Sequence, residues 1–189
     1  MARTVRRYLF LTKSLCMIIQ LCGMSGAGKT TISRIVQREA ANQYGIKVEV
    51  IDGDVYRKTL SKDLGFSKPD RIENMKRLGK EAYRLSKEGI VAIISAINPY
   101  TEVRDELKKT YPFVKEVFVD CSLDVLVQRD TKQLYKKALL PEDHPDKLKN
   151  LTGVNDPFEK PLHPDLHLHT DNMGVDECVR QLLNLIVED

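Results

Sequence analysis

The chain has 189 residues, the size of one domain with a substantial core, so one functional site is expected rather than several modules. Its net charge of +3 comes from 30 basic and 27 acidic residues interspersed along the chain, without the basic run of a polyanion-binding tail, so no nucleic acid partner is expected. No apolar run approaches the roughly 18 to 20 residues that cross a bilayer, so no membrane anchor is expected.

The first 16 residues carry three arginines before a short apolar stretch, which superficially suggests a secretory signal. Lys13 interrupts that stretch, and no small-residue cleavage site follows it. We therefore expect residues 1–16 to be a basic, loosely attached extension, or sequence upstream of a natural start at Met17. The four cysteines lack C-x-x-C spacing, which favours a reducing cytoplasm without disulfides.

Short apolar runs then alternate with longer segments of helical period, which is typical of an α/β fold with a parallel sheet flanked by helices. The expected strands are Met17 to Leu21, Lys47 to Ile51, Ile90 to Ile94, Glu116 to Val119 and Leu166 to Leu168. The expected helices are Lys29 to Gln43, Pro69 to Glu88, Glu102 to Tyr111, Leu123 to Ala138 and Val175 to Val187. The first four strands are almost entirely apolar, which indicates that both faces of the sheet are covered.

Residues 139–164 do not fit this alternation, because five prolines prevent one continuous helix or strand there. So long a connection in a compact domain is usually functional, and we expect a lid.

Gly23 to Thr30 read G-M-S-G-A-G-K-T and match the phosphate-binding pattern G-x-x-x-x-G-K-S/T, directly after an expected strand and at the start of an expected helix. Glycines let successive N–H groups face one anion, and the helix adds its positive dipole end. Lys29 can reach the β- and γ-phosphates, and the Thr30 hydroxyl can join a Mg²⁺ shell. The pattern predicts a magnesium nucleoside triphosphate site, and a glycine-rich connecting turn is the alternative.

GTPases share this loop but read guanine with N-K-x-D, and no N-K-x-D occurs here. Asp171 to Gly174 match the D-x-x-G switch pattern, but they lie near the C-terminus, far from the usual position beside the phosphates. We interpret them as a turn before the last helix, so the sequence disfavours a GTPase switch.

Polar side chains follow the second expected strand. Asp52 and Asp54 emerge at its carboxyl end, the edge at which open α/β sheets collect ligands. A carboxylate there can hold Mg²⁺ through water or accept a proton from an acceptor hydroxyl, and N-capping of a helix by Asp54 is the alternative. Arg57, Arg71 and Asn74 suit an acceptor that carries phosphate or sulfate, and exposed, solvated arginines are the alternative.

With these residues in view, the chain resembles the adenylylsulfate kinase family, whose members phosphorylate the ribose 3′-hydroxyl of adenosine 5′-phosphosulfate. The resemblance covers nearly all residues from Met17 to the C-terminus. The matching motifs are G-M-S-G-A-G-K-T-T, I-D-G-D-V-Y-R, L-G-F-S-K-P-D-R-I-E-N, N-P-Y, Q-R-D-T-K-Q-L-Y-K-K-A and L-T-G-V-N-D-P-F-E-K-P. It implies a three-layer P-loop kinase domain over residues 17–189, with a lid spanning residues 139–164. It also implies a homodimer.

The resemblance further implies roles for individual residues. The residues expected to bind ATP are Gly23, Ser25, Gly26, Ala27, Gly28, Lys29, Thr30, Thr31 and Arg129. Those expected to bind the acceptor are Arg57, Phe66, Arg71, Asn74, Ile97, Pro99, Tyr100, Lys132 and Phe158, with Phe66 and Phe158 on the two faces of its adenine. Those expected in catalysis are Lys29, Asp52, Asp54, Asn98 and Lys132, and Mg²⁺ is expected at Thr30 and, through water, at Asp52. Ordinary packing is the alternative for the phenylalanines, and an exposed helical face for Arg129 and Lys132.

Two features depart from the family pattern. Asn98 stands where the family normally has the serine of I-S-P-Y, and asparagine cannot carry a phosphoryl group, which favours direct in-line transfer. Asn98 can still donate a hydrogen bond to an anion or a ribose.

The expected lid is about five residues longer than the family pattern between Leu139 and Asn150. These departures leave open a related kinase for another nucleotide-linked acceptor, such as a cytidine diphosphate derivative. The polar residues after the second strand disfavour a third interpretation, a regulatory P-loop ATPase.

His163, His167 and His169 invite a metal-binding interpretation, since the last two alternate on one face of an expected strand. No cysteine or carboxylate set at ligand spacing completes a site, so we expect polar positions at a sheet edge instead.

Overall fold

The computed structural model describes residues 16–188, and in this range five parallel strands form one sheet in the order β2-β3-β1-β4-β5. The strands are β1 (Ile18–Cys22), β2 (Val48–Asp52), β3 (Val91–Ser95), β4 (Val114–Asp120) and β5 (Leu166–His169). All five expected strands are confirmed, with ends within one or two residues of those expected.

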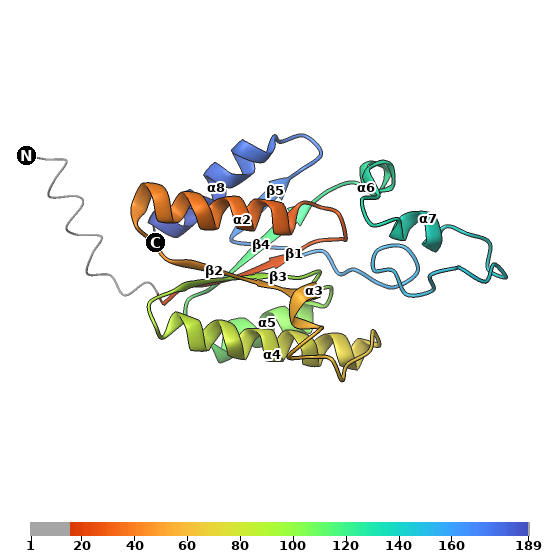
Figure 1. The fold of residues 1–189 in the computed structure, drawn as a ribbon, viewed down its shortest axis with the longest axis horizontal. Coiled ribbons are helices and arrows are strands. Elements are labelled where there is room, and N and C mark those ends of the chain that lie inside the picture. The colour runs from red at the N-terminus through yellow and green to blue at the C-terminus, as the bar shows by residue number, and fades with distance from the viewer. Residues whose placement is uncertain (1–15, 189) are drawn as a thin grey trace, which may run out of the picture.

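Helices cover both faces of the sheet, as the apolar strands indicated. They are α2 (Lys29–Glu39), which continues into the π-helix η1 (Ala40–Tyr44), α3 (Gly53–Tyr56), α4 (Lys68–Ser86), α5 (Thr101–Thr110), α6 (Leu123–Arg129), α7 (Leu134–Ala138) and α8 (Val175–Glu188). Figure 1 shows α2 and α8 on one face of the sheet and α4 and α5 on the other, so the three-layer α/β fold is confirmed.

The core follows from the alternation of side chains along the strands. In β1, Ile19 and Leu21 pack into one cluster with α2 and α8, whereas Ile18 packs into a second cluster with α4 and α5. All three are at most 1% exposed. Because successive residues of a strand point to opposite faces, a mainly apolar strand such as β1 is buried on both sides.

The prediction of one helix from Leu123 to Ala138 is wrong, because the helix is interrupted between α6 and α7. Gln133 has a φ of 55°, which an α-helix does not allow. The side chain of Asp130 accepts hydrogen bonds from the backbone N–H groups of Tyr135 and Lys136, which satisfies two donors in the first turn of α7.

Residues 139–164, the expected lid, contain turns and one isolated bridge between Thr152 and Asp156, so the prediction that they form no single helix or strand is confirmed. Asp171 to Gly174 form the expected turn before α8. Most of the expected extension, residues 1–15, lies outside the described residues. Among residues 16–188 no helix has the length and apolar character needed to span a membrane.

Candidate active site

The loop of residues 23–30 joins β1 to α2 at the carboxyl edge of the sheet, and its backbone depends on glycine. A Cβ on Gly23 would lie 2.2 Å from the carbonyl oxygen of Val119, and Gly28 has a φ of 102°. Helix α2 has no acidic residue in its first turn and no side-chain cap. Its first N–H groups and the positive end of its dipole are therefore available to an anion.

Lys29 lies inside this loop and is only 8% exposed. Its Nζ donates hydrogen bonds of 2.7 Å to the carbonyl oxygens of both Gly23 and Met24. Burial lowers the pKa of Lys29 to about 8. The structure thus holds a cation against the loop at a position where a phosphate would stabilise its charge.

Three side-chain oxygens meet beside the start of α2. The Thr30 hydroxyl donates to Oδ2 of Asp52 at 3.0 Å and lies 3.2 Å from Oγ of Ser95, the last residue of β3. Hydroxyl and carboxylate oxygens are the ligands that Mg²⁺ prefers, so these residues fit that ion. Ser95 was not among the predicted ligands, and the pairing of β2 with β3 brings it to Asp52.

Asp52, not Asp54, caps α3. Oδ1 of Asp52 accepts hydrogen bonds from the backbone N–H groups of Asp54 and Val55, at 2.9 and 3.2 Å. The predicted alternative of a cap by Asp54 is therefore wrong. The side chain of Asp54 instead forms an ion pair of 2.5 Å with Nζ of Lys132. This exposed pair joins two predicted catalytic residues from distant parts of the chain.

A pocket at the carboxyl ends of β2 and β3, the β2–β3 pocket, gathers most of the predicted acceptor residues. Its lining residues are Gly53, Asp54, Arg57, Phe66, Arg71, Asn74, Met75, Ala96, Ile97, Asn98 and Pro99. Phe66 is 55% exposed, and its ring centre lies 4.6 Å from the guanidinium carbon of Arg57 and 5.6 Å from that of Arg71. Burial, and after it the charge of Arg71, lowers the pKa of Arg57. Two cations close together favour an anionic ligand between them.

Two asparagines of the β2–β3 pocket have a buried carbonyl oxygen that accepts no hydrogen bond within the described part of the chain. They are Asn74, 4% exposed, and Asn98, 1% exposed. An unpaired buried acceptor costs about 1–3 kcal/mol, so a ligand that donates hydroxyl groups there would be stabilised. The Asn98 amide nitrogen is already engaged, since it donates to Oε1 of Gln20 at 3.1 Å.

A buried polar network lies behind the pocket, and the sequence analysis missed it. Arg104, 1% exposed, donates to the carbonyl oxygens of Asn98 and Glu159 and forms an ion pair of 2.7 Å with Glu116. Gln20 donates to the backbone oxygen of Arg104. Part of the signal was present, because Gln20 interrupts the otherwise apolar strand β1, and buried polar side chains in strands have partners.

The segment predicted to be a lid, residues 139–164, contacts both the loop and the β2–β3 pocket. Arg71 donates to the backbone oxygen of Asn150 at 2.8 Å and lies 3.4 Å from the carboxylate of Asp156. Gly153, with a φ of 86°, packs so closely that a Cβ there would lie 2.2 Å from Sδ of Met24. These contacts hold three residues of the segment against the predicted ligand sites.

Phe158 and Phe66 line different pockets in this structure. Phe158 stacks on Phe118 with ring centres 5.9 Å apart and lines a cavity of about 640 Å³, the β4 pocket. That pocket is lined by Met24, Cys121, Ser122, Leu123, residues 153–158 and Lys160. The predicted sandwich of an adenine between the two phenylalanines stays a prediction, since it needs both pockets to face one ligand.

The remaining predicted residues surround the loop or support the pocket. Tyr100 is buried and lies 5.0 Å below the ammonium of Lys68. Arg129 donates to the backbone oxygen of Thr170, whose hydroxyl in turn donates to the backbone oxygen of Ala27. Ser25 accepts a hydrogen bond from the Tyr135 hydroxyl at its backbone oxygen. Gly26 lies in the loop, and Thr31 is exposed on the first turn of α2.

Comparison with known proteins agrees with this geometry. A family model described as adenylylsulphate kinase matches residues 15–169. The adenylyl-sulfate kinase of Chloroflexus aurantiacus is 47% identical over 167 residues, which are 88% of this chain and 87% of the relative. The Mycobacterium tuberculosis APS kinase CysC, solved in complex with AMPPNP and APS, is 33% identical with a TM-score of 0.84, over 92% of this chain and 98% of that chain.

A third similar structure is the hexameric APS kinase from Thiobacillus denitrificans, which is 27% identical with a TM-score of 0.64 over 91% of this chain and 28% of that chain. The resemblance deduced from the motifs is confirmed by the family match and by the identity to the curated relative. The chain belongs to the adenylylsulfate kinase family.

Proposed function

We propose that this protein is an ATP-dependent adenylyl-sulfate kinase that phosphorylates the ribose 3′-hydroxyl of adenosine 5′-phosphosulfate to give 3′-phosphoadenosine 5′-phosphosulfate. One observation carries the proposal: the phosphate loop and the β2–β3 pocket open at the same edge of the sheet, with Asp52 and Asp54 between them. A donor phosphate and an acceptor hydroxyl can therefore be held next to each other.

The residues present are suited to transfer by positioning and by charge stabilisation. The loop N–H groups and Lys29 hold the donor triphosphate. Arg57 and Arg71 hold the phosphosulfate of the acceptor, and the unpaired oxygens of Asn74 and Asn98 accept hydrogen bonds from its hydroxyl groups. Since Asn98 cannot carry a phosphoryl group, transfer is directly in line from ATP to the acceptor.

We also propose Mg²⁺ as the cofactor, held by the Thr30 hydroxyl and, through water, by Asp52. When bound, the ion would neutralise charge on the β- and γ-phosphates of ATP. The proposal rests on the three oxygens of Thr30, Asp52 and Ser95, which meet beside the loop.

An acceptor analogue tests the reaction itself. Purified protein with ATP and Mg²⁺ is expected to add one phosphoryl group to adenosine 5′-phosphosulfate, at the 3′ position by NMR of the product. The 3′-deoxy analogue should bind competitively without releasing ADP. ADP release at the same rate with the 3′-deoxy analogue would refute transfer to that hydroxyl.

Two substitutions of Asp52 separate the effect of its carboxylate charge on catalysis from the effect of its helix cap on stability. Asp52→Asn keeps a good N-cap for α3, so the melting temperature should change little, but loss of the charge should lower kcat by about 100-fold. Asp52→Ala should lose activity similarly and also lose about 1 kcal/mol of stability, because the cap is gone. Steady-state kinetics and thermal unfolding measure the two effects, and Asp52→Asn with wild-type kcat would exclude a role for the charge.

The lowered pKa of Lys29 leads us to expect that the affinity for ATP depends on pH. Burial lowers the pKa of Lys29 to about 8 without ligand, and the phosphates of ATP should raise it again. Above pH 8 the free protein has lost this proton and must take it up on binding, so affinity should fall by up to about tenfold per pH unit. Calorimetry in two buffers of different ionisation enthalpy measures the uptake, which should be near zero at pH 7 and approach one proton at pH 9. Equal uptake at both pH values would contradict this pKa.

A cytoplasmic location and a homodimer complete the proposal. The absence of disulfides among the described cysteines supports the location. The family resemblance supports the homodimer, and solution mass measured by light scattering tests it. A hexamer, as in the relative from Thiobacillus denitrificans, is the other outcome to distinguish.

A further inference from the structure

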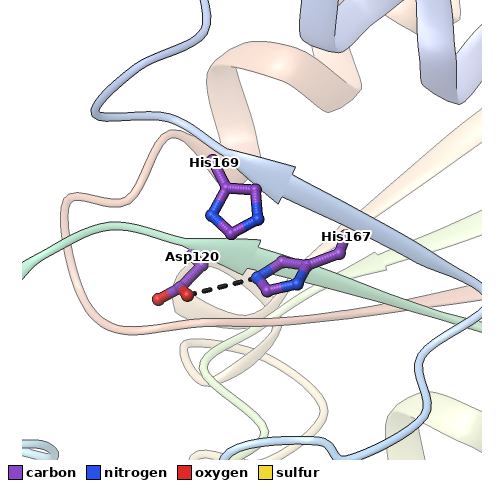
Figure 2. Close-up of side chains that lie close together, drawn as sticks. All are labelled: Asp120, His167 and His169. Atoms are coloured by element: carbon purple, nitrogen blue, oxygen red, sulfur yellow. Dashed lines mark hydrogen bonds and ion pairs between the residues drawn. The ribbon is translucent and has the colours of Figure 1, made fainter.

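The sheet edge formed by β5 brings together three side chains that the proposed kinase reaction does not use. Asp120, His167 and His169 each offer one ligand atom, and these atoms all lie within 4.8 Å of one another. Figure 2 shows the three side chains directed toward a common region from β4 and β5. They are half-buried or exposed, so solvent ions can reach them.

Strand register explains why these residues share a face. Asp120 pairs with His169 and Phe118 pairs with His167 across the parallel ladder. Residues two apart along a strand point to the same side, so all four side chains lie on one face of the sheet. Leu168, between the two histidines, points the other way and is fully buried with α8. Two hydrogen-bonded strands therefore fix the relative positions of the three ligand atoms.

The side chains are also held in orientations that suit a shared ligand. Nε2 of His167 lies 3.1 Å from Oδ2 of Asp120. The ring of His167 packs on Phe118 at 4.7 Å and on His169 at 3.9 Å, measured between ring centres. Ligand atoms around one tetrahedral ion with bonds near 2.1 Å are about 3.4 Å apart. Small side-chain rotations would therefore bring all three atoms to one ion.

We propose that Asp120, His167 and His169 form a binding site for a divalent transition metal of the Zn²⁺, Co²⁺ or Ni²⁺ type. Two imidazole nitrogens and one carboxylate oxygen suit these ions, whereas Mg²⁺ and Ca²⁺ prefer oxygen alone. Three protein ligands leave at least one position for water. The proposed site is separate from the phosphate loop and the β2–β3 pocket, because the side chains of the three residues contact none of their residues in the described part of the chain.

The sequence alone disfavoured this site because no carboxylate stood at ligand spacing from the histidines. Asp120 lies 47 residues before His167, and only the pairing of β4 with β5 brings it there. His163, the third histidine of that sequence pattern, is not part of the cluster. Lys160 lies 4.0 Å from Oδ1 of Asp120 and also lines the β4 pocket, so a bound cation would compete with Lys160 for this carboxylate.

Metal titration tests the site without nucleotide. The protein, free of a histidine tag and treated with a chelator, is titrated with Co²⁺, and absorption in the visible range reports coordination. We expect one equivalent to bind, and Zn²⁺ to displace it. His167→Ala and His169→Ala should each weaken binding by at least about 100-fold, because losing even an outer partner of a metal ligand costs 10- to 100-fold. Asp120→Asn should weaken it as well.

His163→Ala is the matched control, since it removes an exposed histidine of the same segment and should bind Co²⁺ like the wild type. Zn²⁺ should raise the melting temperature of the wild type and of His163→Ala but not of His169→Ala. Absence of stoichiometric binding to the wild type would refute the site. Unchanged binding in the His167 and His169 variants, or strong thiolate charge-transfer absorption, would also refute it by placing the metal elsewhere. Kinase assays in magnesium alone remain a separate test of the proposed function.

Discussion

Lys29→Ala should lower kcat for phosphoryl transfer by at least about 1000-fold, because the ammonium is the one cation buried inside the phosphate loop among the described residues. Loss of a single preorganised donor at a developing charge costs 100- to 1000-fold in other enzymes, and Lys29 adds a full positive charge. The two bonds of Nζ to the carbonyl oxygens of Gly23 and Met24 place that charge before any ligand arrives.

The matched control is Lys47→Ala, which removes an exposed lysine just before β2, at the opposite end of that strand from Asp52. It should leave kcat and KM for both substrates within about twofold, since surface substitutions away from the site have small effects. Thermal unfolding of Lys29→Ala checks that the variant is folded. Wild-type turnover by folded Lys29→Ala would refute the assignment of the phosphate loop.

The second large effect is expected on the acceptor side. Arg57→Gln and Arg71→Gln should each raise KM for adenosine 5′-phosphosulfate by about 100-fold, because a charge-assisted hydrogen bond to an anion contributes about 1.5–3 kcal/mol. KM for ATP should stay nearly unchanged in Arg57→Gln, since Arg57 lines only the β2–β3 pocket. Initial rates at varied concentrations of each substrate measure both constants.

The Arg57→Gln and Arg71→Gln variants should differ in thermal stability. Arg71 is 8% exposed and bonds to the backbone oxygens of Phe66 and Asn150, so Arg71→Gln should also lower the melting temperature. Arg57 is less buried and donates to Gly65, so its variant isolates ligand binding from folding. The control is Arg84→Gln, which changes an exposed arginine of α4, the helix that also carries Arg71, and it should keep wild-type kinetics. An unchanged KM for the acceptor in Arg57→Gln would contradict the assigned pocket.

The fold could be predicted because its signals are local. Each of the first four strands contains a short, mainly apolar run, and both core clusters follow from the alternation of residues such as Ile18 and Ile19. The phosphate loop could be predicted because its glycines are a consequence of backbone geometry at a fixed spacing. The break between α6 and α7 could not be predicted, since it depends on hydrogen bonds from the first turn of α7 to the Asp130 side chain, which helical periodicity does not reveal.

Details of the site depend on contacts between distant residues, which a single sequence does not reveal. Asp52 and Asp54 are both carboxylates after β2, and only the structure assigns the cap to Asp52 and the Lys132 pair to Asp54. Asn98 was expected to donate a hydrogen bond to ligand, whereas its amide nitrogen bonds to Gln20 and its oxygen has no partner among residues 16–188. The Asp120, His167 and His169 cluster likewise arises from strand register.

The central claim is that the β2–β3 pocket selects adenosine 5′-phosphosulfate as the phosphoryl acceptor. The most direct measurement is ADP release by the purified protein with magnesium ATP and a panel of acceptors, including cytidine diphosphate derivatives, reported as kcat/KM. We predict that adenosine 5′-phosphosulfate gives the highest kcat/KM by a wide margin, with little ADP released when no acceptor is present. No release with adenosine 5′-phosphosulfate, together with release for another nucleotide, would contradict this account.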